Sequence, residues 1–202
     1  MSLPTKFKKI AIVGAGGIGS HLAEMFFDYG VNRGQFDYTD LTIDVYDDDT
    51  VDTKNLLHQN FKDDDLNEQK AKVMANRYAM TPVTRFMKKE DFPNYDLIFC
   101  CVDSMVFRKA LYEWSWANPT KAFWIDGRCE SRQGGVFNKT NSKELLSKMI
   151  NDNTERKGCL LQYEKDNNIS HVMPRIVAGY MVQMYLNLIR GVTSLPEKIF
   201  MV

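Results

Sequence analysis

The sequence predicts an α/β protein with a Rossmann-like, doubly wound and mostly parallel sheet, followed by late antiparallel strands and a C-terminal helix. Short apolar runs alternate with segments of helical periodicity through the first two-thirds of the chain. The first apolar run stops at a cluster of glycines, and the second stops at a cluster of aspartates. Repeats and Ser/Pro-rich linkers are absent, so we expect a single nucleotide-binding domain over residues 1–202.

Strands are predicted where apolar runs rich in β-branched and aromatic residues stop at turn-forming residues. These runs cover residues 10–13, 41–46, 96–102, 123–125 and 135–137. Residues 32–40 are more polar, and we interpret them as a surface insertion. In a doubly wound sheet the ligand binds beyond the carboxyl ends of the strands, where the topology switches.

Helices are predicted where apolar residues recur at three- and four-residue spacing. These segments cover residues 18–30, 65–82, 105–117 and 176–191. Asp65 to Glu68 resembles a capping box that opens the second helix, and Pro82 closes it. Residues 173–195 carry more apolar side chains than one helix face buries, which predicts a dimer through this surface.

The composition excludes several classes of protein. The chain has 26 basic and 26 acidic side chains, and its formal net charge of zero argues against a nucleic-acid binder that works through bulk positive charge. No apolar run approaches the roughly 18–20 residues that span a bilayer, and the N-terminus lacks an apolar signal core. The four cysteines form no C-x-x-C pair, which argues against a four-thiolate zinc site. We therefore expect a cytoplasmic protein with reduced thiols that acts on neither nucleic acid nor membranes.

A glycine-rich loop at residues 14–19 directly follows the first predicted strand and opens the first helix. Gly14, Gly16, Gly17 and Gly19 let the backbone pass close to a phosphate, which the free N–H groups of the helix N-terminus face. The alternative is a tight strand-to-helix turn that holds no ligand.

An acidic run, Asp47 to Asp49, follows the second predicted strand. A carboxylate at such a strand end accepts hydrogen bonds from ribose hydroxyls, and we assign this role to Asp47. Asp47 lies 28 positions after Gly19, compared with the roughly 20 that are typical of dinucleotide-binding motifs. The surface insertion explains the excess. For Asp48 we favour a solvated turn. These features fit a nicotinamide dehydrogenase, a methyltransferase or a nucleotide-binding transferase.

Residues 47–61 separate these classes, because they resemble the D-x-D-x-V-x-x-x-N-L-x-R-Q stretch of the ubiquitin-activating enzyme superfamily. Its prokaryotic members include the ThiF, MoeB and HesA adenylyltransferases. The glycine loop fits the family form G-x-G-G-x-G, and Lys70 lies near the position of the family's phosphate-binding lysine. Residues 101–104 together with Arg108 are similar to the family's D-N-x-x-x-R. The resemblance covers roughly residues 9–110, and fewer residues match the family pattern after residue 136.

The resemblance implies ATP-dependent adenylation of the C-terminal carboxylate of a small ubiquitin-like or sulfur-carrier protein, with ATP and Mg²⁺ as cofactors. It implies a homodimer or a heterodimer. The residues that it assigns to ATP are Gly14, Gly16, Gly17, Gly19, Asp47, Asp49, Asn55, His58 and Lys70. Asp103 would hold the metal, since Mg²⁺ takes one carboxylate together with waters and phosphate oxygens. The implied catalytic residues are Lys70, Asp103 and Cys159.

Each of these roles has a simpler alternative. Lys70 is also explained as an exposed helix lysine, and Asp103 as a helix N-cap. Arg108 either pairs with an acidic side chain near the site or is solvated. Cys159 either takes the activated acyl group on its thiolate or is a small buried residue.

Three departures from the family pattern bear on activity. His58 stands where the family has an arginine, and an imidazole offers a weaker grip on phosphate than a guanidinium. Few residues precede the first strand, whereas relatives with a longer N-terminal segment use an arginine from it. The paired zinc cysteines of many relatives are absent. Two rival functions are therefore a non-catalytic partner subunit that keeps the nucleotide pocket and an NAD-dependent oxidoreductase.

Overall fold

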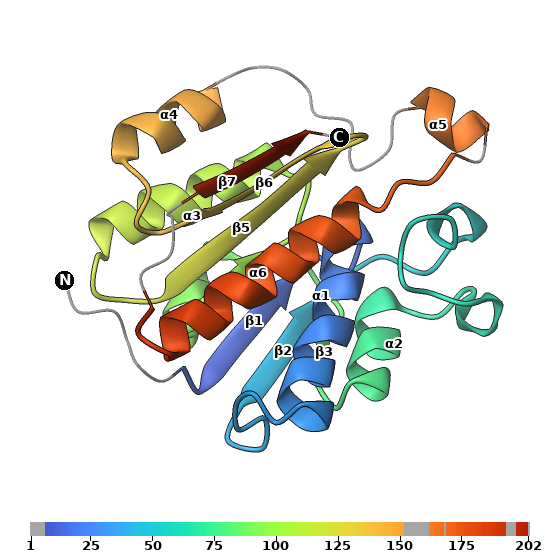
Figure 1. The fold of residues 1–202 in the computed structure, drawn as a ribbon, viewed down its shortest axis with the longest axis horizontal. Coiled ribbons are helices and arrows are strands. Elements are labelled where there is room, and N and C mark those ends of the chain that lie inside the picture. The colour runs from blue at the N-terminus through green and yellow to red at the C-terminus, as the bar shows by residue number, and fades with distance from the viewer. Residues whose placement is uncertain (1–6, 152–161, 168, 193–196, 202) are drawn as a thin grey trace.

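The computed structural model describes residues 7–151, 162–167, 169–192 and 197–201, and seven strands in it form one sheet in the order β3-β2-β1-β4-β5-β6-β7 (Figure 1). The strands are β1 Lys9–Val13, β2 Thr42–Tyr46, β3 Thr81–Val83, β4 Leu97–Cys100, β5 Phe123–Glu130, β6 Gln133–Asn138 and β7 Glu197–Met201. Neighbouring strands from β3 to β5 pair in parallel. β6 and β7 run antiparallel to their neighbours.

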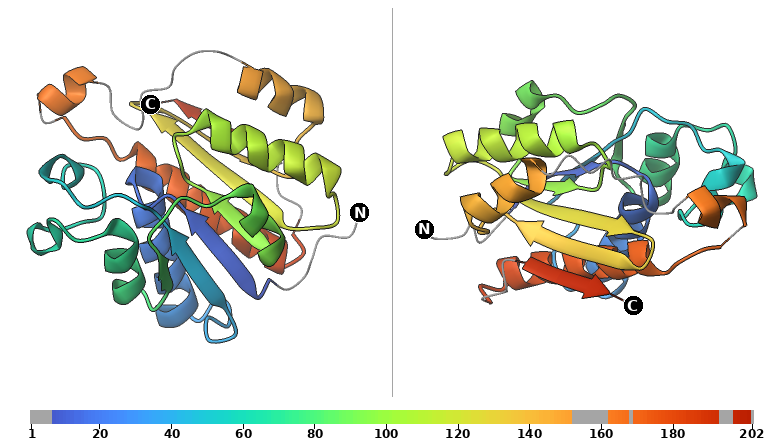
Figure 2. Two further views of the ribbon diagram at one scale, coloured as in Figure 1. Left: turned by 180° about the vertical axis from the view of Figure 1, so that it is seen from behind. Right: turned by 90° about the horizontal axis from the view of Figure 1, so that it is seen from above.

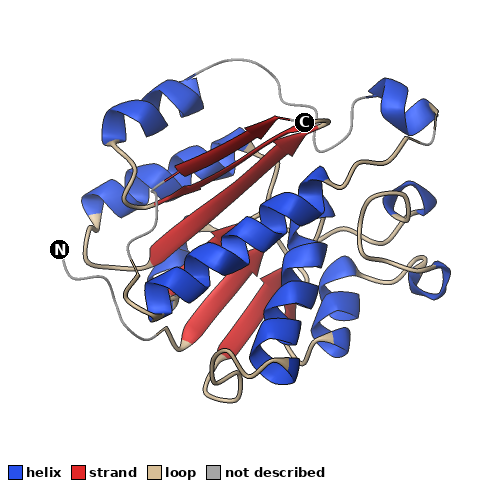
Figure 3. Ribbon diagram, viewed as in Figure 1, coloured by secondary structure: helices blue, strands red, loops and turns tan. Residues whose placement is uncertain are grey.

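Helices cover both faces of this sheet (Figure 3). They are α1 Gly17–Phe27, α2 Lys70–Arg77, α3 Met105–Ala117, α4 Lys143–Asn151, α5 Gln162–Asp166 and α6 Met173–Ile189. α1 and α6 lie side by side on one face, while α3 lies on the opposite face (Figures 1 and 2). The predicted doubly wound sheet, its late antiparallel strands and the C-terminal helix are therefore confirmed. Within the described residues, no helix is both long and apolar enough to cross a membrane.

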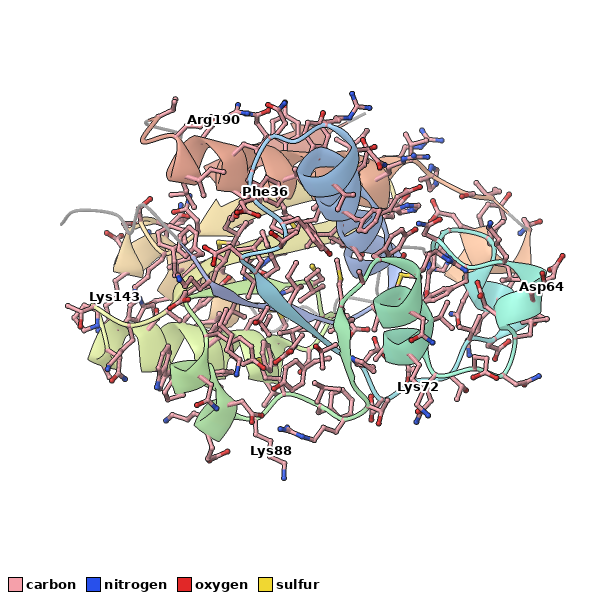
Figure 4. All side chains as sticks on the ribbon, turned by 90° about the horizontal axis from the view of Figure 1, so that it is seen from below. Phe36, Asp64, Lys72, Lys88, Lys143 and Arg190 are labelled. Atoms are coloured by element: carbon pink, nitrogen blue, oxygen red, sulfur yellow. The ribbon has the colours of Figure 1, made fainter. Side chains whose placement is uncertain are left out.

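The core forms two layers because side chains alternate between the faces of a strand. Ile10 and Ile12 of β1 are buried on the face covered by α1 and α6. Ala11 and Val13 are buried on the face covered by α3. Such a strand reads as a continuous apolar run, which is why the sequence reveals it. Labelled charged side chains lie at the periphery in Figure 4, namely Asp64, Lys72, Lys88 and Lys143.

The first helix ends differently from the prediction. α1 stops before Gly30, and the chain continues as a π-helical turn over Asp28–Asn32. A Cβ at Gly30 would lie 2.6 Å from Tyr38 and 2.8 Å from Phe36, so this glycine makes room for two aromatic side chains. The ring centre of Phe36 lies 4.8 Å from that of Phe26. The predicted surface insertion thus contributes two aromatic rings to the core.

The predicted capping box and helix stop around α2 are wrong. The Asp65 carboxylate accepts two hydrogen bonds from Arg77 Nη2, at 2.8 and 2.7 Å, and one from the Lys62 N–H at 2.7 Å. The helix begins later, at Lys70. Pro82 lies in the middle of β3, which is an edge strand of the sheet. Proline is tolerated in an edge strand because its missing N–H need not face a neighbour.

α6 buries most of its apolar side chains within its own chain. A Cβ at Gly127 would lie 2.4 Å from Met181 Sδ, and one at Gly134 would lie 2.7 Å from Met173 Sδ, so two glycines of the β5–β6 hairpin let this helix approach closely. Its buried residues are Met173, Pro174, Val177, Ala178, Met181, Val182, Met184, Tyr185, Leu186 and Leu188. The described residues therefore do not show the apolar surplus from which a dimer through this helix is predicted. The oligomeric state itself stays a prediction.

Candidate functional site

A cleft of about 800 Å³ opens beyond the carboxyl ends of β1, β2 and β4. It lies at the switch point of the sheet, where a ligand is expected in a doubly wound fold. The cleft brings together, from the predicted site, Gly14, Gly16, Gly17, Asp47, Asp49, Asn55, His58, Lys70 and Asp103. Gly19 is not part of the lining, and Cys159 lies outside the described residues.

The glycines of the 14–19 loop have different structural roles. Gly14 has a φ of +90°, and its N–H donates to the Tyr46 carbonyl oxygen at 2.8 Å. A Cβ at Gly19 would lie 1.7 Å from the Gly14 carbonyl oxygen. A Cβ at Gly16 would meet nothing within 4 Å, because this position opens into the cleft. Gly14 and Gly19 shape the turn, whereas Gly16 leaves room above it.

This difference predicts opposite outcomes for two alanine substitutions. Gly19→Ala is expected to destabilise the fold by about 1–3 kcal/mol or more, because its methyl group overlaps a backbone oxygen. Gly16→Ala is expected to change the free energy of unfolding by no more than about 0.5–1 kcal/mol but to weaken ATP binding. Denaturant unfolding and calorimetric ATP titration measure the two effects. If Gly16→Ala binds ATP as tightly as the wild type, the loop does not hold phosphate.

Asp47 links the end of β2 to the glycine loop. Its Oδ2 accepts the Ala15 N–H at 2.6 Å, and its Oδ1 accepts the Asp49 N–H at 2.9 Å. Burial raises the pKa of Asp47, although these two N–H groups favour the charged form. Each carboxylate oxygen keeps a further lone pair for a hydroxyl donor. Asp48 is exposed, in keeping with a solvated turn.

Lys70 is buried at the start of α2, so its interpretation as an exposed helix lysine is wrong. Its Nζ donates to Asp49 Oδ2 at 2.9 Å, and its backbone N–H donates to the Asp49 carbonyl oxygen at 3.0 Å. The Asp49 side chain is 67% exposed, whereas that of Lys70 is 6% exposed. The Lys70 side chain is thus buried and its ammonium group pairs with a solvated carboxylate at the cleft. An anionic ligand can displace such a carboxylate.

Asn55 and His58 lie in the turn that borders the cleft. Asn55 is buried, and its Oδ1 accepts the Asp52 N–H at 2.8 Å. The Asn60 N–H donates to Ser20 Oγ at 2.9 Å, which ties this turn to α1. Both predicted ATP contacts therefore sit on a segment that is fixed next to the glycine loop.

Asp103 is exposed and lines the cleft just beyond β4. It does not cap α3, because Ser104 has that position and accepts the Phe107 N–H on Oγ at 3.2 Å. The helix-cap alternative for Asp103 is therefore wrong. A solvated carboxylate at this edge of the sheet is the type of oxygen ligand that Mg²⁺ prefers.

A buried cluster of charges beneath the cleft was not predicted as a whole. Asp126 is fully buried in β5, and its Oδ1 accepts Arg108 Nε at 3.0 Å while its Oδ2 accepts Arg128 Nε at 2.7 Å. Tyr112 OH also donates to Asp126. Burial alone would raise the pKa of Asp126, but the two guanidinium groups outweigh it and lower that pKa. Arg108 is thus paired rather than solvated. The sequence signal for the cluster is the spacing of Asp126 and Arg128, because residues two positions apart in a strand lie on the same face.

Of the cysteines in the described region, Cys100 is a free thiol. Cys100 and Cys101 are buried, as predicted from their apolar strand. Burial raises the pKa of the Cys100 thiol. Cys101 and Cys129 line the cleft.

Solved structures similar to this one share its fold at low sequence identity. Escherichia coli MccB with MccA-N7isoAsn gives a TM-score of 0.67 at 14% identity, with 98% of this chain and 62% of that chain covered. E. coli MccB with ATP gives 0.65 at 15% identity, with 96% and 60% covered. PaaA gives 0.65 at 15% identity, with 96% and 61% covered. This chain thus spans about three-fifths of the length of these proteins.

Sequence comparison gives two further findings. A search of curated proteins finds no match. The sequence profile of the ThiF family matches residues 5–201, which is nearly the whole chain. The protein therefore belongs to the ThiF family.

Proposed function

We propose that this protein is an ATP-dependent adenylyltransferase that activates the C-terminal carboxylate of a small ubiquitin-like or sulfur-carrier protein. The observation that carries the proposal is the meeting of Asp47, Lys70 and Asp103 with the glycine loop in one cleft. Structures of the similar protein MccB with ATP and with MccA-N7isoAsn support a nucleotide and a small partner. A carboxylate, a buried lysine and a metal-type carboxylate together match the needs of phosphate transfer chemistry.

The proposed binding mode assigns each group one contact. Asp47 accepts hydrogen bonds from the ribose hydroxyls, and the glycine loop faces the phosphates with its N–H groups. Lys70 exchanges its Asp49 partner, which its Nζ contacts at 2.9 Å, for a phosphate oxygen. Mg²⁺ held at Asp103 would offset the charge of the phosphates.

The proposed reaction is a displacement at the α-phosphorus of ATP. A carboxylate oxygen of the substrate attacks this phosphorus, and the bond to the pyrophosphate oxygen breaks. The products are an acyl-adenylate and pyrophosphate. Lys70 stabilises the charge that develops on the phosphate oxygens, and the fixed glycine loop aligns the two reacting groups.

His58 is the residue where we expect the strength of this site to be tuned. A charge-assisted hydrogen bond contributes about 1.5–3 kcal/mol, so a mostly neutral imidazole in place of a guanidinium is expected to cost roughly ten- to hundred-fold in affinity or rate. Histidine titrates in the range between about pH 8 and 6, so ATP binding should strengthen as the pH falls through it. His58→Arg should raise adenylation at pH 8 and flatten this profile, while His58→Ala should lose both.

ATP titrations of the wild type, His58→Arg and His58→Ala across this pH range test the prediction. Identical pH profiles in all three proteins would show that His58 only packs against its loop. The assignment of the cleft would then rest on Asp47, Lys70 and Asp103.

Exchange of labelled pyrophosphate into ATP tests the proposed function directly. We expect exchange that depends on Mg²⁺ and on a candidate small-protein substrate. The replacement of the family arginine by His58 favours one rival, a non-catalytic partner subunit that kept the nucleotide pocket. Mg·ATP binding without exchange, for every substrate offered, would support that rival and contradict the proposed activity.

A further inference from the structure

Two buried guanidinium groups share a single buried carboxylate in the middle of β5. Arg108 is 3% exposed, Arg128 is 4% exposed and Asp126 is 0% exposed. Within the described residues, Asp126 is the acidic partner of both arginines. The cluster therefore holds one positive charge in excess. A buried charge without a counter-charge is costly, so the surplus calls for an anion.

The unsatisfied atom of this cluster is Arg128 Nη1. Arg128 Nε donates to Asp126 at 2.7 Å, and Nη2 donates to Tyr112 OH at 2.8 Å. Nη1 is buried and has no hydrogen-bond partner in the part of the chain that the structure describes. Native proteins rarely leave a buried donor unpaired, and the exceptions are commonly functional.

Arg108 differs from Arg128 in this respect, because all three of its nitrogens have acceptors. Arg108 Nε donates to Asp126, and Nη2 donates to the carbonyl oxygens of Val102 and Gly127. Its Nη1 lies 3.7 Å from Met105 Sδ. Arg108 therefore fixes the cluster, and the capacity to bind a further anion belongs to Arg128.

The guanidinium of Arg128 is held rigidly. Its Cζ lies 5.9 Å from the ring centre of Tyr112 and 5.4 Å from that of Phe137. With Asp126 and Tyr112 fixing two nitrogens, little side-chain freedom remains to be lost when an anion binds. The donor is thus preorganised.

Arg128 lines the same cleft as the glycine loop. It belongs to β5, whereas Asp47, the proposed ribose contact, follows β2 on the other side of β1 and β4 in the sheet order. Asp126 pairs with Cys100 at the end of β4, which places Arg128 two residues further, beyond the end of that strand. β5 and β2 are three strand spacings apart, or about 14 Å at the usual 4.8 Å per spacing. An anion at Arg128 therefore lies on the opposite side of the glycine loop from Asp47.

We propose that Arg128 forms a second anion subsite in this cleft, distinct from the phosphate contacts, and that it takes a carboxylate of the acyl substrate. The proposal rests on the proposed adenylyltransferase function, which requires such a substrate. A guanidinium N–H to a carboxylate oxygen is a strong, directional pair. The carboxylate comes either from the substrate C-terminus or from an acidic side chain next to it.

Calorimetric titrations with three small probes test this subsite and separate the two sources. Glycylglycine carries a terminal carboxylate, N-acetylaspartylglycinamide carries only a side-chain carboxylate, and glycylglycinamide carries neither. Each is titrated into the protein with and without AMPCPP and Mg²⁺. We expect one of the two acids to bind about ten-fold or more tightly than the amide, as one charge-assisted hydrogen bond implies. The acid that binds identifies the source.

Variants assign the effect to Arg128. Arg128→Met should erase the preference for the acid, and Arg128→Lys should reduce it while keeping the positive charge. Arg132→Met is the matched control, since Arg132 is exposed on the same hairpin, and it should keep the full preference. Thermal unfolding checks that each variant is folded. Should Arg128→Met fail to fold, the lysine variant and the ¹⁵N chemical shift of the Arg128 side chain in the wild type report the same contact.

Three results would overturn the proposal. The first is equal binding of both acids and the amide by the wild type, and the second is an acid preference that survives both Arg128 substitutions. The third is an Arg128-dependent affinity for pyrophosphate but for neither acid, which would make Arg128 a phosphate contact. AMPCPP binding by the wild type is measured in the same series, so a failure of the proposed ATP function is seen separately from a failure of the carboxylate subsite.

Discussion

Asp103→Asn is expected to remove the Mg²⁺ dependence of ATP binding and leave the fold intact. Asp103 is exposed beside the glycine loop, and asparagine keeps its shape but loses the charge that holds a hard cation. The loss of one metal carboxylate leaves phosphate charge uncompensated, an effect of several kcal/mol, so Mg·ATP affinity should fall by about a hundred-fold or more. ATP titrations with Mg²⁺ and with a chelator measure the difference.

Asp48→Asn is the matched control, because Asp48 is also exposed and also lines the cleft. It should keep the Mg²⁺ dependence. The carboxylates of Asp47, Asp48 and Asp49 lie within 4.8 Å of one another. If Asp48→Asn loses the Mg²⁺ dependence and Asp103→Asn retains it, the metal belongs to this aspartate cluster and the assignment to Asp103 is wrong.

Asp126→Ala is expected to produce the largest loss of stability among single substitutions near the site. It leaves two buried guanidinium groups without their common carboxylate. Removing one partner of a buried ion pair costs about 3–5 kcal/mol, a large part of the stability of a typical domain. Urea unfolding measures this loss. Glu144→Gln is the control, since its pair with Lys148 is solvated and should contribute at most about 1 kcal/mol.

The same cluster predicts a pH dependence of stability. The two arginines outweigh burial and lower the pKa of Asp126 in the folded protein, so its contribution is present above the ordinary pKa of an aspartate, near 4. That contribution is lost as the pH falls through the lowered folded pKa. Asp126→Asn should therefore show a weaker loss of stability on acidification than the wild type. Parallel acid-denaturation curves for the two proteins would contradict the buried charge cluster.

The fold is readable from the sequence because its central strands are buried on both faces. β1 and β4 are short apolar runs that end at a glycine loop and at Cys101, and such runs identify a parallel sheet on local pattern alone. β3 was missed because it contains Pro82, and only its place at the sheet edge makes that residue acceptable. Phe36 was assigned to a surface insertion, since its packing against Phe26 depends on a contact that no local pattern contains.

The site was predicted as a set of residues, but the states of those residues required the structure. The order of motifs along the chain placed Asp47, Lys70 and Asp103 at one edge of the sheet. Whether Lys70 is buried and whether Asp103 caps a helix depends on the neighbours each meets after folding. The pairing of Arg108 with Asp126 spans 18 positions and joins α3 to β5, so spacing alone left it open.

We propose that this cleft binds Mg·ATP rather than a nicotinamide dinucleotide. A calorimetric titration of Mg·ATP and of NADH into the wild type and Lys70→Met tests it most directly. Both ligands have a ribose for Asp47 and phosphates for the glycine loop, but only the ATP assignment uses Lys70 and Asp103. We expect that Mg·ATP binds, that NADH does not, and that Lys70→Met weakens Mg·ATP binding by about ten-fold or more. Binding of NADH in preference to Mg·ATP, with an affinity that Lys70→Met leaves unchanged, would contradict it.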